Sequence, residues 1–86
     1  MKHRFDLIDP KFLLHMAEVL THGRQKYPDQ DLKDTPFDDN IQSILRHANE
    51  LHRGEYINHK DWGLPVEAHI AVRAMMSFLI RTKNEK

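Results

Sequence analysis

One edge of the segment 10–26 carries side chains that could hold a metal or a phosphate. Glu18 and His22 are four residues apart, His15 lies three residues before Glu18, and Lys26 lies four residues after His22. Residues at these spacings share one face of a helix. A carboxylate and an imidazole on such a face can bind a divalent metal or a metal-bound phosphate, but exposed helices often carry the same residue types. A metal site and an ordinary solvated face are therefore alternatives.

A sharper candidate lies in the segment 65–82, where His69 and Arg73 share a face of an otherwise apolar helix. Burying an arginine without an anionic partner costs free energy. We therefore expect Arg73 to pair either with a carboxylate from a neighbouring element or with the phosphate of a ligand.

The segment 36–53 places His47 beside an apolar stripe, where a histidine could be a ligand or a hydrogen-bonded boundary residue. Arg46, Glu50 and Arg53 follow the i, i+4, i+7 spacing of a surface ion-pair ladder. We interpret these three residues as structural.

Two loop positions add further candidates. Glu55 follows the end of the second helix, where the helix dipole disfavours negative charge, so its carboxylate should have a cationic partner such as Arg53 or a metal. Asp61 and Trp62 come shortly before the third helix, whose free N–H groups attract phosphate. The indole could stack on a nucleobase or could pack the loop onto the core.

Proline and glycine divide the chain into the helical elements that must position these side chains. Pro10, Pro36 and Pro65 each stand at a helix start, where proline loses no hydrogen bond. Tyr27 before Pro28 ends the first helix, and Gly54 ends the second. The predicted helices are residues 10–26, 36–53 and 65–82. On the second helix, one apolar face is formed by Ile41, Ile44, Leu45, Ala48 and Leu51.

Apolar residues surround most of the circumference of the third helix, and this pattern predicts self-association. A single core in a chain of 86 residues cannot easily cover such a helix with two others. The predicted fold class is all-α, a single domain over residues 1–86 in which three antiparallel helices assemble into a helical-bundle homo-oligomer, a dimer or higher, through the third helix.

The amino-acid composition and the missing motifs restrict the expected cellular location and the expected type of catalysis. The chain has no cysteine, a net charge of zero and no apolar run of membrane-spanning length, so we expect a cytoplasmic protein that does not bind membranes or nucleic acid. A glycine-rich phosphate loop, a nucleophile elbow and an HExxH zinc motif are all missing from the sequence. Covalent catalysis is therefore not expected, and hydrolysis by a metal-activated water held on carboxylates stays open.

The order of the residues resembles that of the phage-associated dATP/dGTP diphosphohydrolase N-terminal domain family. The resemblance spans nearly the whole chain and rests on Phe5-Asp6-Leu7-Ile8 with Pro10, Ala17-Glu18-Val19-Leu20-Thr21, Gly23, Lys26-Tyr27, Leu45-Arg46-His47, Gly54-Glu55, Gly63-Leu64-Pro65 and Ala68-His69. This family is grouped with the MazG-like all-α pyrophosphohydrolases, which are helical oligomers. The resemblance implies a purine nucleotide ligand, Mg²⁺ or Mn²⁺, and hydrolysis of a triphosphate to monophosphate and pyrophosphate.

The resemblance also assigns roles to the candidate residues. It implies that Glu18, Glu55 and Asp61 hold the metal, and that His47 or His69 orients water or phosphate. Lys26 also matches the family, and together with Arg73, which does not match it, would neutralise the leaving pyrophosphate. Trp62 is a candidate for contact with the nucleotide because of its indole, and the resemblance does not assign it.

Three departures from the family pattern leave other functions open. Arg73 stands where the family has asparagine, Trp62 replaces a small polar residue, and the first helix carries a lone Glu18 in place of paired carboxylates. One alternative is a protein that binds a nucleotide without hydrolysing it, such as a viral sponge for a nucleotide signal. A helical protein-interaction module is another.

Overall fold

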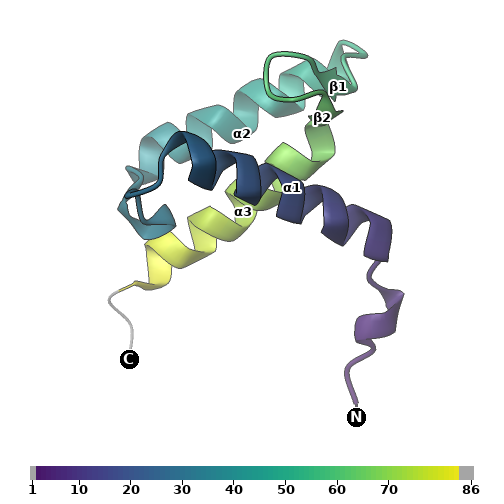
Figure 1. The fold of residues 1–86 in the computed structure, drawn as a ribbon, viewed down its shortest axis with the longest axis horizontal. Helices are drawn as coiled ribbons and strands as arrows, with labels where there is room; N and C mark the ends of the chain where they lie inside the picture. Colours follow the sequence, from purple (N-terminus) through teal and green to yellow (C-terminus); the bar gives the residue numbers. More distant parts are fainter. Residues whose placement is uncertain (1, 84–86) are drawn as a thin grey trace.

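The computed structural model describes residues 2–83 and shows three helices whose successive members run in opposite directions (Figure 1). The elements in chain order are η1 (Phe5–Leu7), α1 (Pro10–Lys26), η2 (Leu32–Asp34), α2 (Phe37–His52), β1 (Ile57–Asn58), β2 (Leu64–Pro65) and α3 (Val66–Thr82). The all-α fold class is confirmed, and each predicted helix boundary agrees with the structure to within one residue.

The helix ends follow the local signals in the sequence. The Asp9 carboxylate caps α1 by accepting a hydrogen bond from the Phe12 amide at 2.9 Å. At the end of α2, Gly54 adopts a φ of 86°, which glycine tolerates because it has no Cβ. The Glu55 amide then donates to the Glu50 carbonyl at 2.9 Å, the six-to-one bond of a Schellman motif.

A short two-stranded ribbon was not predicted. β1 and β2 pair antiparallel, with Asn58 opposite Leu64 and Ile57 opposite Pro65. Strands this short carry no periodic pattern, so sequence alone predicted only a loop here. The ribbon fixes the direction in which the chain enters α3.

The apolar core lies on α3 and is completed by α1 and η2. Val72, Met76 and Ile80 are buried at consecutive turns of α3. They are covered by the partly buried side chains of Met16, Val19, Leu20 and Leu32. A single chain therefore covers one stripe of α3, whereas Phe78 on the same helix stays 56% exposed.

The face of α2 that packs inward is polar, although the sequence of this helix indicates an apolar face. Asn40, Ser43 and His47 are its buried residues, and Asn40 has no exposed surface. On the other side of the helix Leu45 is 57% exposed, whereas Ile44 and Leu51 are partly buried. Hydrogen bonds between α2 and α3 compensate the burial of these polar side chains. The Asn40 side-chain amide donates to the Arg73 carbonyl at 2.8 Å, and Arg73 Nη1 donates to Asn40 Oδ1 at 3.3 Å.

Removing the Asn40 amide should destabilise the fold, because the substitution leaves polar groups of Arg73 without their partner. We expect Asn40→Ala to lower the free energy of unfolding by about 1–3 kcal/mol, the range for a buried unsatisfied polar group. Thermal denaturation measures the change, and Gln42→Ala, an exposed position on the same helix, is the matched control. Equal stability of the two variants would show that the Asn40 bonds do not hold α2 against α3.

Candidate functional site

The candidate site is a cleft of about 740 Å³ between the three helices. Its polar side chains come from the end of α1 and the following loop, from α2, from the loop before β2 and from α3. They are Arg24, Lys26, Tyr27, Gln30, Thr35, Arg46, His47, Asp61, Trp62, His69 and Arg73. Six of the eight predicted site residues therefore line one cleft, and Glu18 and Glu55 do not.

Positive charge dominates the cleft. Arg24, Lys26, Arg46 and Arg73 carry guanidinium or ammonium groups, whereas Asp61 supplies the one carboxylate among the lining residues. A concave surface with this balance attracts anions.

Arg73 is the most confined of these cations. Burial lowers its pKa from the ordinary arginine value, and the nearby charge of Arg46 lowers it further. Among residues 2–83, no ion pair joins Arg73 to a carboxylate, although Asp61 acts on it from a distance. Of the two partners predicted for Arg73, the carboxylate of a neighbouring element is thus not found in contact with it.

A second arginine is held beside the first by the buried face of α2. Arg46 Nη2 donates a hydrogen bond to the Ser43 hydroxyl at 3.3 Å. Two guanidinium groups facing one cleft repel each other, and an anion between them would relieve that repulsion.

Two buried histidines form the floor of the cleft. The rings of His47 and His69 stack, with centroids 5.3 Å apart. His47 Nδ1 lies 3.0 Å from Glu50 Oε1. A carboxylate accepts, so Nδ1 carries the proton in this contact and Nε2 is the ring nitrogen left for another partner.

His69 holds an unused hydrogen-bonding atom. Its side chain is 8% exposed, and among the described residues its Nε2 is the one buried side-chain nitrogen or oxygen without a partner. Burial lowers the pKa of His69, and the positive charge that His47 can carry lowers it further. Since unpaired buried polar atoms are rare, an atom of this kind beside a cleft is a feature expected of a ligand site.

Trp62 stands at the edge of the same cleft in an unusual backbone conformation. Its φ of 65° lies in the left-handed region, which a bulky side chain rarely adopts. The indole stacks on His22 of α1, with ring centroids 4.5 Å apart and planes 10° from parallel, yet 49% of the residue stays exposed. One side of the Trp62 ring therefore packs the loop onto α1, as one of the two interpretations of the sequence expected.

The predicted metal ligands do not come together within the chain. Glu18 pairs with His15 Nδ1 at 3.0 Å, and Glu55 pairs with Arg53 at 2.6 Å. Across residues 2–83, no group of three histidine, aspartate or glutamate side chains is arranged to hold a metal ion. The donor set of residues 2–83 therefore does not fit Mg²⁺ or Mn²⁺, which need several oxygen ligands around one point.

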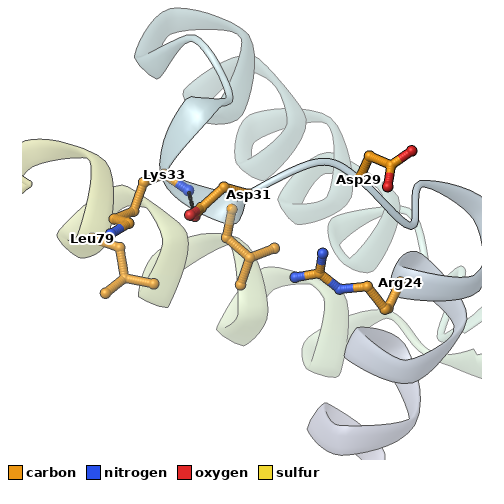
Figure 2. A pocket seen from close by; sticks show the side chains of 6 residues that line it. Arg24, Asp29, Asp31, Lys33 and Leu79 are labelled. Carbon is orange, nitrogen blue, oxygen red and sulfur yellow. Dashed lines mark hydrogen bonds between the residues drawn. The ribbon is translucent and has the colours of Figure 1, made fainter.

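A smaller hollow of about 420 Å³ adjoins the loop after α1. Figure 2 shows the Arg24 side chain reaching into it while Asp29 points away. The Arg24 guanidinium donates to the carbonyls of Pro28 and Gln30, each at 3.1 Å. The Arg24 guanidinium therefore holds the loop after α1 in place.

Sequence reasoning missed Asn40, Ser43, Arg46 and Glu50 as contributors to the site. Arg46 and Glu50 were interpreted as a surface ladder, but Arg46 bonds to Ser43 and Glu50 bonds to His47. The i, i+3 spacing of both pairs was a usable signal, since residues three apart meet on a helix face.

Comparison with known proteins gives one result. The sequence matches the family described as dATP/dGTP diphosphohydrolase, N-terminal, over residues 1–86. Searches of curated proteins and of solved structures gave no significant match. In the described part of the chain, no helix combines the length and apolar character needed to cross a membrane. Because the match covers the whole sequence, the chain belongs to the family of dATP/dGTP diphosphohydrolase N-terminal domains.

Proposed function

We propose that the cleft binds the phosphate groups of a purine nucleotide. The observation that carries this proposal is the confined Arg73, which faces Arg46 and has no carboxylate in contact among the described residues. A phosphate accepts several hydrogen bonds from guanidinium groups and compensates their charge. Lys26 lines the same cleft and extends the cationic surface.

His69 supports the same ligand. Its unpartnered Nε2 can donate a hydrogen bond to a phosphate oxygen when the ring is protonated or in the Nε2–H tautomer. The cleft volume of about 740 Å³ lies within the usual range for small-molecule sites. The choice of a purine deoxynucleotide rests on the family description.

Hydrolysis of the nucleotide to monophosphate and pyrophosphate is a second candidate, favoured by the family description and by His47. Glu50 holds the His47 ring so that Nε2 can accept a proton from water. Hydrolysis would use Mg²⁺ or Mn²⁺ as its cofactor. Carboxylates other than those of residues 2–83 would have to complete the metal site. Binding without hydrolysis, as in a nucleotide sponge, needs only the cationic cleft.

Self-association is also part of the proposal. The chain exposes 6712 Å², whereas the scaling for monomeric proteins gives about 5,300 Å² at this mass. The exposed apolar side chains include Leu45 on α2 and Phe78 on α3. A standard interface covers about 800 Å² of each partner, so a second copy could account for much of the excess. The proposed interface is formed by α2 together with part of α3.

Arg73→Gln should weaken binding of dATP or dGTP by about 10- to 100-fold, the range for losing a charge-assisted phosphate contact. Isothermal titration calorimetry measures the affinity. Arg81→Gln, an exposed position on the same helix, is the matched control and should bind like the parent. Undiminished binding by Arg73→Gln would remove Arg73 from the phosphate site.

If the cleft hydrolyses nucleotides, incubation of dATP or dGTP with Mg²⁺ or Mn²⁺ should release pyrophosphate. His47→Gln should slow that release by about 100-fold, the lower range for a general base. His59→Gln, at an exposed loop position, is the control. Tight binding with intact nucleotide recovered would reject hydrolysis and favour sequestration.

Leu45→Glu should shift the protein toward the monomer, because a carboxylate at this position would be desolvated in the proposed interface. Multi-angle light scattering at micromolar concentration measures the mass in solution. Gln42→Glu adds the same charge outside the apolar face of α2 and should leave the mass unchanged. A monomeric parent protein would contradict the self-association proposal.

A further inference from the structure

We propose that the exposed face of the Trp62 indole is the nucleobase platform of the cleft, with the base adding to the existing stack of Trp62 on His22. This inference rests on the proposed binding of nucleotide phosphates near Arg73. It assigns the other end of the ligand, and it selects an aromatic base over a sugar phosphate or an inorganic phosphate chain.

The backbone at Trp62 is the first argument. A left-handed conformation is costly for a large side chain and favourable for glycine or asparagine. The neighbouring Gly63, with a φ of 68°, already provides the permissive residue of this turn. A tryptophan in the adjacent left-handed position is therefore not required by the turn, and strain of this kind persists where a side chain is held for a purpose.

The loop is built to hold that conformation. Asn58 is 7% exposed, and its carbonyl accepts hydrogen bonds from the amides of Asp61 at 3.2 Å and Gly63 at 3.0 Å. Its side-chain amide donates to Asp61 Oδ2 at 3.1 Å. These bonds bracket Trp62 on both sides and fix the direction of its side chain.

The aromatic surroundings are the second argument. His22 covers one face of the indole at 4.5 Å, which limits the motion of the ring. The residue is still 49% exposed and borders the cleft, so packing against the core does not account for its size. An indole that is stacked on one face, lines the cleft and stays 49% exposed is a suitable surface for a flat, polarisable ring.

The position of the platform fits the rest of the proposed ligand. Trp62, Arg73 and His69 line the same cleft, and the Nε2 atom of His69 is buried without a hydrogen-bond partner. A nucleotide has one aromatic and one anionic end, and the lining has one strongly aromatic edge and a cluster of cations. Purines offer the larger stacking area and should bind more tightly than pyrimidines.

The single tryptophan of the chain makes a direct test possible. We expect dGTP and dATP to quench its fluorescence on binding, and inorganic tripolyphosphate to bind the parent protein with little quenching. Trp62→Asn should weaken dGTP binding by about 10- to 100-fold, the range for losing one base–aromatic stack, while tripolyphosphate binding is unchanged. Trp62→Phe should retain most of the dGTP affinity, because it keeps a ring. Calorimetry supplies the affinities of both variants.

Stability separates a binding role from a packing role. Asparagine tolerates the left-handed conformation, so Trp62→Asn should leave the melting temperature unchanged or raise it. A lowered melting temperature with unchanged dGTP affinity would show that Trp62 merely packs the loop, and would overturn the inference. If tripolyphosphate binds as tightly as dGTP and the fluorescence does not change, the base platform fails while the phosphate site stands. If neither ligand binds, the proposed function fails and the platform fails with it.

Discussion

The reciprocal hydrogen bonding of Asn40 and Arg73 is the constraint on which the structure depends. A fully buried amide on α2 needs partners, and it finds them in the Arg73 carbonyl and guanidinium of α3. Meeting this requirement turns the polar side of α2 inward, and with it Ser43 and His47. The arginine is consequently drawn between the helices, where it has an amide for a neighbour and no contacting carboxylate among residues 2–83.

This arrangement explains why the cleft is polar and cationic. An apolar face of α2 turned inward would have filled the space against α3 with aliphatic side chains. With the polar face inside, Arg46 is held by Ser43, and the ring of His47 lies against His69. The cost is an unpartnered nitrogen on His69 and two arginines that repel each other. Both costs fall when an anion with several acceptor atoms enters the cleft.

The helices were predictable because their signals are local. Pro10, Pro36 and Pro65 mark the helix starts, and Gly54 marks the end of α2 through its left-handed backbone. The inward face of α2 was not predictable in the same way, because the apolar pattern that includes Ile44 and Leu45 did not indicate the polar side chains of Asn40 and Ser43 as the most deeply buried ones. Periodicity reports which face avoids water, but it does not tell whether the partner lies in the same chain or in another copy.

The site was predictable in part for the same reason. His69 and Arg73 could be paired from their spacing on one helix, whereas the contacts of Trp62 with His22 and of Arg73 with Asn40 join residues that are 40 and 33 positions apart. The metal assignments followed family resemblance, and a single chain does not gather Glu18, Glu55 and Asp61. Their separation is consistent with the arginine at position 73, because a guanidinium would repel a cation bound nearby.

The polar side chains in the cleft and the exposed Leu45 of α2 both result from the rotation of this helix about its axis. When α2 turns Asn40, Ser43 and His47 inward, it must turn Leu45 outward, because both sets lie on the same helix. A second copy that covers Leu45 would hold α2 in this orientation, and it would therefore maintain the cationic cleft on the opposite side. A ligand that bridges Arg46 and Arg73 would in turn stabilise the same orientation of α2. Self-association and anion binding should consequently favour each other without any direct contact between the interface and the ligand, since both select one rotation of a single helix.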